Sequence, residues 1–226
     1  MKKLLLSSLT SLALVSSLAN ATDEQAVGVS IGTIGVDAEY SRIVMPEYNL
    51  AVRVSTGGFS YSGDYTDTDT KYDTDLSLFN LGATLEYHPF NSGFYLGLGA
   101  FYQNSSYSLD ATSSNGKYTF DGHEYDASKL GGVSGDVYGL NHFVPYLGIG
   151  YDDSLFDNDN LFFTIKAGAW YQDSPKVNLT VHDCQLGSAE CTQLEQDVAK
   201  EEQDINDDIK DYQWWPVIQI GISYRF

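Results

Sequence analysis

The chain has 226 residues, of which 31 are Asp or Glu and 12 are Lys or Arg, so its formal net charge is −19 at pH 7. Such an acidic chain lacks the basic surface with which proteins bind nucleic acid, which argues against that class of function. Glycine (21 residues) and tyrosine (17) are plentiful and the mean hydropathy is −0.24, which suits a β-barrel in which only every second strand residue faces lipid.

The first 21 residues have the organisation of a secretory signal peptide. Lys2 and Lys3 form the charged region, residues 4–18 form an apolar region rich in serine, and residues 19–21 read Ala-Asn-Ala, a small-x-small cleavage site. We expect cleavage after Ala21, which removes two lysines and changes the net charge from −19 to −21. The apolar run is too short to anchor the chain in a bilayer, and no later run approaches the length of a transmembrane helix.

From residue 27 onward, apolar residues recur with a period of two, which is the pattern of β-strands with two different faces. The segments with this alternation are 27–32, 36–44, 50–59, 81–88, 94–102, 145–151, 161–171 and 218–226. In the last of them, Ile218 to Phe226, the even-numbered residues share one face and the odd-numbered residues the other.

The connections between these strands are of two kinds. The short ones are 45–49, 91–93 and 152–160, and the long polar ones are 62–74, 111–136 and 173–211. Bacterial barrels combine short periplasmic turns with longer external loops. The sequence therefore predicts an all-β fold, an eight-stranded antiparallel up-and-down transmembrane barrel formed by residues 22–226, with its first hairpin near residues 32–35. Ten strands result if residues 118–125 form a further hairpin.

One stretch departs from the β pattern. Residues 189–211 contain no Gly or Pro and carry a narrow apolar stripe at helical spacing, formed by Leu194, Val198, Ile205 and Ile209. We expect a short helix in the last external loop, either a solvated acidic cap of the barrel mouth or a docking surface for a partner.

The two cysteines, Cys184 and Cys191, lie seven residues apart in a polar part of an exported chain. A disulfide that closes a small loop is the expected arrangement. A zinc site would need more ligands than His182 and a few carboxylates.

If the more apolar face points to lipid, several charged residues point into the lumen. They are Asp37, Glu39, Arg53, Glu86, His88, Lys166 and Arg225. Charges in a narrow interior must pair or keep water, and Arg225 is expected to pair with Asp37 or Glu39. Two interpretations stay open: the charges are a structural ion-pair plug, or they line a narrow solute path and set its selectivity.

The long connections are strongly acidic, so we expect an acidic mouth. Its candidate residues are Asp64, Asp67, Asp69, Asp73, Glu201, Asp204, Asp207 and Asp208. Such a mouth would raise the local concentration of basic amino acids or divalent cations, although acidic loops also simply keep a surface soluble. The Asp-Thr-Asp-Thr run lacks the glycine and the closing glutamate of a calcium loop, so no metal site is expected.

Signals of catalysis are weak. The four histidines (His88, His123, His142 and His182) occur without a nucleophile motif such as Gly-x-Ser-x-Gly, and His142 near a barrel rim is the best candidate among them. We predict no catalytic residue and no cofactor.

Several segments resemble the CarO-type outer-membrane proteins of Acinetobacter and its relatives. They are residues 144–150 (Val-Pro-Tyr-Leu-Gly-Ile-Gly), residues 168–180 and the acidic run into residues 212–217 (Tyr-Gln-Trp-Trp-Pro-Val). Residues 85–90 and the following Gly93-Phe-Tyr-Leu resemble a wider group of uncharacterised proteobacterial barrels. The final strand, ending in the aromatic Phe226, resembles the terminal strand of bacterial outer-membrane barrels. The Cys184–Cys191 loop and the Tyr-Arg-Phe ending depart from the CarO pattern.

The resemblance implies a place in the outer membrane, with contacts to its lipid and lipopolysaccharide and recognition of Phe226 by the assembly machinery. CarO-type proteins are described as uptake channels for ornithine or basic amino acids and are linked to carbapenem entry. We therefore predict a narrow channel for small cationic solutes that leads past Glu86, Arg53 and Lys166. The alternative is a closed structural or surface-interaction barrel with functional acidic loops, resembling OmpA or opacity proteins. A lipid-modifying enzyme is a third and weaker interpretation.

Overall fold

The structure of the protein is a computed structural model, which describes residues 25–67, 70–90, 92–113, 116–155 and 158–226. The predicted signal peptide with its cleavage site, and the candidate residue Asp69, lie outside these described residues.

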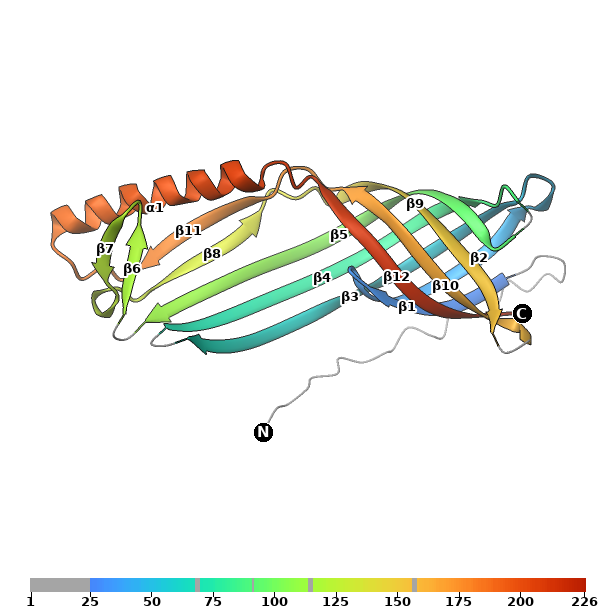
Figure 1. Ribbon diagram of the computed structural model, residues 1–226, viewed down its shortest axis with the longest axis horizontal. Coiled ribbons are helices and arrows are strands. Elements are labelled where there is room, and N and C mark those ends of the chain that lie inside the picture. Colours follow the sequence, from blue (N-terminus) through green and yellow to red (C-terminus); the bar gives the residue numbers. More distant parts are fainter. Residues whose placement is uncertain (1–24, 68–69, 91, 114–115, 156–157) are drawn as a thin grey trace, which may run out of the picture.

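The chain forms a closed antiparallel β-barrel, as the sequence predicts (Figure 1). Its eight strands, in their order around the barrel, are β1 (Gln25–Gly32), β2 (Gly35–Met45), β3 (Leu50–Asp67), β4 (Thr70–Tyr87), β5 (Phe94–Ser113), β9 (Phe143–Leu155), β10 (Asn158–Tyr171) and β12 (Trp214–Arg225). The last strand closes on the first, with Ile31 opposite Ile220, and the Phe226 N–H donates to the Gln25 carbonyl oxygen at 2.9 Å. A 3₁₀ turn, η1 (Pro46–Tyr48), joins β2 to β3 at the same end.

Side chains alternate between the outer surface and the interior, because neighbouring strand residues point to opposite faces. The outer surface has a band of exposed aliphatic side chains, such as Val29, Ile31, Leu85, Leu98, Leu147, Ile149, Ile220 and Ile222. Exposed aromatic rings lie at its two ends, with Tyr87, Phe90, Tyr151, Tyr224 and Phe226 at one and Phe143, Tyr212 and Trp214 at the other. An apolar band between two aromatic girdles is typical of outer-membrane barrels.

Three strands are much longer than a membrane requires. Strands β3, β4 and β5 have 18, 18 and 20 residues, about twice the 9–11 that cross a bilayer. They continue beyond the barrel, where β8 (Gly132–Tyr138) and β11 (Lys176–His182) extend the sheet in the order β3-β4-β5-β8-β11 (Figure 1).

The expected long loop at residues 62–74 is therefore wrong. Ser62 pairs with Asp75, and Gly63 with Thr74, in a hairpin that continues β3 and β4. The alternation of apolar and polar residues fades there because both faces of the hairpin lie outside the membrane.

We call residues 59–80, 103–142 and 172–213 the outer lobe. Besides the extended sheet it contains a hairpin of β6 (Lys117–Phe120) and β7 (His123–Asp126), the 3₁₀ turn η2 (Ala127–Lys129) and the helix α1 (Ser188–Ile209). The hairpin expected within residues 118–125 is thus confirmed, but it pairs outside the barrel, so the barrel keeps eight strands.

The lobe has a hydrophobic core of its own, formed by Phe120, Tyr125, Leu130, Leu194 and Val198. The expected helix is confirmed, but its two expected roles are not. Of its four stripe residues, Leu194 and Val198 are buried inside the lobe and Ile205 and Ile209 are half-buried, so the stripe packs mainly within the lobe. The helix runs along β11 and not across the barrel mouth (Figure 1).

Candidate functional site

The barrel interior contains a network of ion pairs centred on Arg53. The network lies in the half of the barrel nearer the termini and the short turns. The Arg53 guanidinium donates to Glu86 from Nε (2.7 Å), to Glu39 from Nη1 (2.9 Å) and to Asp152 from Nη2 (3.1 Å). Lys166 Nζ binds the second oxygen of Glu39. Arg53, Glu39, Glu86 and Lys166 are all buried, and buried charges are stable only when paired in this way.

The structure therefore brings together four of the charged residues expected in the lumen. Asp152 was missed, because the sequence assigned it to the turn at residues 152–160. It continues the inward alternation of Tyr146, Gly148 and Gly150 on β9, and that signal could have identified it.

Asp37 lies two residues before Glu39 on β2, farther from the barrel end that carries the termini. It is fully buried and accepts a hydrogen bond from the Gln219 side-chain amide. Among the described residues Arg225 pairs neither with Asp37 nor with Glu39, whose two oxygens bind Arg53 and Lys166, so the expected pairing is wrong. Strand register explains this, because Arg225 stands opposite Ala26 at the barrel end whereas Asp37 stands opposite Ser30. Four residues of strand amount to about 13 Å. Arg225 instead places its guanidinium carbon 5.1 Å from the ring centre of Phe162.

A cavity of about 570 Å³ lies below the ion-pair network, at the end of the barrel that carries the termini and the short turns. Its charged and polar lining includes His88, Asp152, Asp153 and Arg225, and turn residues such as Asn49 rim it. The His88 ring, half-buried, lies 5.3 Å from that of Tyr95. We call this cavity the periplasmic vestibule, because the short turns at this end of the barrel are expected to face the periplasm.

An aromatic layer lies above the ion-pair network. Its residues are Ile34, Phe101, Val144, Tyr146, Trp170 and Val217. The Phe101 ring lies 5.6 Å from both Tyr146 and Trp170. A cavity of only about 20 Å³ separates this layer from Arg53 and Lys166, enough for roughly one water molecule. Side chains therefore fill the described interior at mid-height.

Glycines make room for these rings. A Cβ atom on Gly82 would lie 2.2 Å from the Phe101 ring, and one on Gly148 would lie 2.1 Å from the Tyr146 hydroxyl oxygen. The sequence analysis missed the aromatic layer, although large rings alternating with glycine on the inward face could have indicated it.

Most of the negative charge lies in the outer lobe, which has 21 of the acidic residues and six of the basic ones. Of the predicted mouth residues, Asp64 and Asp73 lie on β3 and β4, where Lys71 binds Asp73 at 2.6 Å. Glu201, Asp204, Asp207 and Asp208 all lie on α1. The side chain of Asp67 is outside the described part of the chain. The described acids thus lie along the lobe, on the β3–β4 hairpin and on α1.

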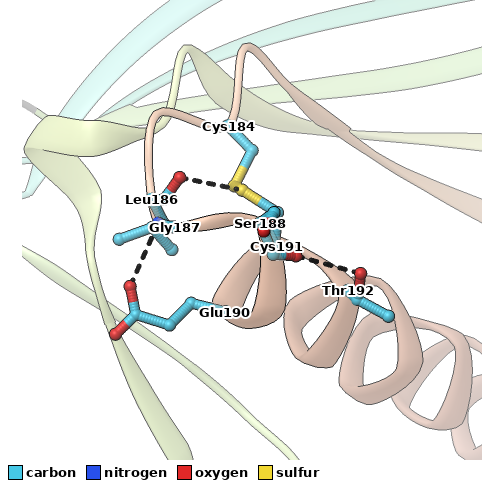
Figure 2. The surroundings of a disulfide bond; sticks show 7 residues. All are labelled: Cys184, Leu186, Gly187, Ser188, Glu190, Cys191 and Thr192. Carbon is cyan, nitrogen blue, oxygen red and sulfur yellow. Dashed lines mark hydrogen bonds between the residues drawn. A yellow bond between two sulfur atoms is a disulfide. The ribbon is translucent and has the colours of Figure 1, made fainter.

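The expected disulfide between Cys184 and Cys191 is confirmed, and it joins the loop that follows β11 to the first turn of α1 (Figure 2). Beside it, the Glu190 carboxylate accepts from the Gly187 N–H at 3.2 Å, which caps the first turn of the helix.

Asp197 fixes the middle of α1 to the β6–β7 hairpin. Its fully buried carboxylate accepts from the Tyr125 hydroxyl at 2.5 Å and the Gln193 amide at 2.8 Å, and it lies 2.8 Å from His123 Nδ1. The hydrogen bond from Tyr125, and then those from Gln193 and His123, hold the pKa of the Asp197 carboxyl below its ordinary value, against the opposing effect of desolvation.

Helix α1 also covers the free edge of β11. The Asn206 side chain accepts from the Val177 N–H at 2.7 Å and donates to the Val177 carbonyl oxygen at 3.0 Å. Glu202 accepts from the Leu179 N–H at 3.0 Å. These side chains replace a neighbouring strand, which is one way in which proteins protect an exposed sheet edge.

Comparison with solved structures identifies the architecture. CarO of Acinetobacter baumannii matches with a TM-score of 0.60 and 23% identity over 90% of this chain and 97% of that one. CarO2 of the same organism matches with a TM-score of 0.60 and 25% identity over 90% and 98% of the two chains. The protein has the fold of the CarO-type outer-membrane barrels. A major outer membrane protein of Thermus thermophilus is similar too, with a TM-score of 0.52 and 15% identity over 91% of this chain and 100% of that one.

A scan against protein-family models and a search of curated proteins give no match. The CarO-type fold and the two aromatic girdles make this protein an outer-membrane β-barrel.

Within this CarO-type fold, His142 stacks on Tyr102 with ring centres 5.6 Å apart, and its Nδ1 lies 3.0 Å from the Gln103 carbonyl oxygen. The part of the chain that the structure describes holds no cluster of three or more His, Cys, Asp or Glu side chains able to bind a metal ion. Among these residues there is also no helix with the length and apolar character needed to cross a membrane.

Proposed function

We propose that this protein is a closed outer-membrane barrel that holds its outer lobe at the cell surface, and that the lobe performs its function. The observation that carries the proposal is the filled interior, with an ion-pair network below and an aromatic layer above.

The energy of the network supports a closed state. Freeing Arg53 means separating it from three carboxylates, and breaking even one buried ion pair costs about 3–5 kcal/mol. A state with this pair open would be populated in roughly one molecule in a hundred or fewer.

The lobe supports the second half of the proposal. It has its own core, a disulfide and a helix that covers a sheet edge, so it is a folded unit. Loops that merely connect barrel strands have no need of such an arrangement.

Conductance tests the proposal. We expect the purified protein in a planar bilayer to give background current, and liposomes containing it to show no swelling in arginine or ornithine. A general porin reconstituted in parallel is the positive control. Stepwise conductance or swelling comparable to that control would overturn the proposal.

The periplasmic vestibule favours a second candidate function, slow passage of small cationic solutes such as basic amino acids. The path would lead from the acidic lobe past Lys166, Arg53 and Glu86 into the vestibule. It predicts slow arginine uptake into liposomes that Glu86→Gln alters while uptake of a neutral sugar stays unchanged. Uptake equal to that of protein-free liposomes would exclude it.

A further inference from the structure

The sheet of the outer lobe has two edges, and one of them is open. Strand β2 pairs with β3 only as far as Val36 opposite Gly58, whereas the pairing of β3 with β4 continues to Asp67 opposite Thr70. Over residues 59–67, β3 therefore has a strand neighbour on one side only, among the residues that the structure describes. Nine residues of strand measure about 30 Å.

The other edge of the same sheet is protected. There, Asn206 and Glu202 of α1 satisfy the backbone groups of Val177 and Leu179. Proteins often protect an open edge with charged residues, especially lysine, or with proline. Residues 59–67 read Phe-Ser-Tyr-Ser-Gly-Asp-Tyr-Thr-Asp, contain no lysine or proline, and carry only the negative charges of Asp64 and Asp67, which do not repel a cationic strand. An unprotected edge of this kind is the surface to which an extended peptide adds by backbone hydrogen bonding.

The side chains beside the edge are aromatic and exposed. Phe59 and Tyr61 are 46% and 53% exposed. Both lie on the face that continues the barrel interior, because Arg53 and Ser55 on the same strand point inward. Tyr61 begins a row of paired residues that crosses the sheet through Leu76, Tyr107 and Val137 to Val177. An incoming strand could thus pack apolar side chains against the end of this row.

The negative charge of the lobe indicates which kind of segment binds at the β3 edge. With 21 acidic and six basic residues, two lobes would repel each other, so a second copy of this chain is a poor partner for the edge. A positively charged segment would be attracted, and the attraction would weaken as salt is added.

We propose that the free edge of β3, residues 59–67, docks an extended cationic peptide segment, which adds as a further strand to the lobe sheet beside Phe59 and Tyr61. This inference rests on the proposed function, in which the barrel displays the lobe at the cell surface (the display function). It adds the class of partner that the lobe binds.

The test uses the full-length protein in detergent micelles and fluorescently labelled ten-residue peptides of alternating lysine and valine. We expect anisotropy titrations to show saturable binding of this peptide and none of a glutamate–valine peptide. The same lysine–valine peptide with every second backbone nitrogen methylated should bind at least tenfold more weakly, because it loses half of its hydrogen-bond donors while keeping its charge. Unchanged affinity of the methylated peptide, or no binding of the unmodified one, would overturn the proposal.

A matched pair of variants separates the edge from the overall charge. Ser60 and Ser106 lie in one row across β3, β4 and β5, both exposed, but Ser60 is on the edge strand and Ser106 is two strands inward. We expect Ser60→Lys to weaken binding at least tenfold and Ser106→Lys, which changes the charge equally, to weaken it less than threefold. Equal effects would show simple electrostatic attraction and overturn the edge site. That result would leave the display function intact, because conductance tests that function separately.

Discussion

At the scale of single residues, alternation along the strands predicts which side chains point inward, but not which of them meet. Arg53, Glu39, Glu86 and Lys166 lie in the interior as expected, because successive residues of a strand point to opposite faces. The partner of Arg225 could not be predicted in this way. Pairing depends on how far along its strand each residue lies, and this is set by register between strands distant in sequence.

A first prediction concerns Asp197 in the lobe. Its folded pKa is below the ordinary value, so its contribution to stability is complete above the pKa of the unfolded chain and is lost as pH falls through the folded value. We expect amide exchange in β6 and β7, corrected for the intrinsic pH dependence of exchange, to quicken as pH falls below the ordinary value of 3.8. Asp197→Asn should reduce protection at neutral pH and remove this acid-induced step. Retention of the step in the variant would contradict the assignment to Asp197.

A second prediction concerns Asn206, which occupies both backbone groups of Val177. Asn206→Ala leaves this N–H and carbonyl without their partner, at a cost of about 1–3 kcal/mol if water does not replace it. Hydrogen exchange at Val177 should then be roughly ten- to a hundredfold faster. The exposed neighbour Gln203→Ala is the control, and equal acceleration in both variants would argue against the capping role.

At the scale of elements, the eight strands, the helix and the β6–β7 hairpin could be predicted from periodicity and turn residues. The extension of β3 and β4 could not, because a strand with water on both faces loses the contrast on which that pattern depends. The role of α1 was missed for another reason. The edge that it covers exists only once β8 pairs with β5 and β11 pairs with β8, and pairing between strands distant in sequence leaves no local pattern in residues 132–138 and 176–182.

The disulfide belongs to this scale, since it fixes the first turn of α1 to the loop that follows β11. A closed loop of this small size stabilises a fold by roughly 2–3 kcal/mol in the chain-entropy account. We expect Cys184→Ser with Cys191→Ser to make the segment between them sensitive to limited proteolysis, while heat-resistant migration of the barrel on gels is retained. The wild-type protein in reductant should behave like the double variant; resistance of both to cleavage would show that the helix needs no such link.

At the scale of the whole molecule, the barrel closes where β12 meets β1, and Phe226 lies at that seam with its side chain 54% exposed. If the outer-membrane assembly machinery engages this residue, Phe226→Ala should lower the amount of protein in the outer membrane several-fold. Cell fractionation measures this. Phe143→Ala removes another exposed aromatic ring of the outer surface and serves as the control. Equal levels for the two variants would remove Phe226 from the assembly signal.

The length of β3, β4 and β5 has a mechanical consequence. Each strand runs without a break from the periplasmic rim to the lobe, a contour of about 60 Å, and roughly half of it stands outside the bilayer. No hinge separates the lobe from its membrane anchor along these three described strands. A force that pulls on the lobe therefore acts in shear on the inter-strand hydrogen bonds along the full length of these strands. The connection between barrel and lobe is thus rigid, and the lobe keeps its distance and orientation relative to the membrane.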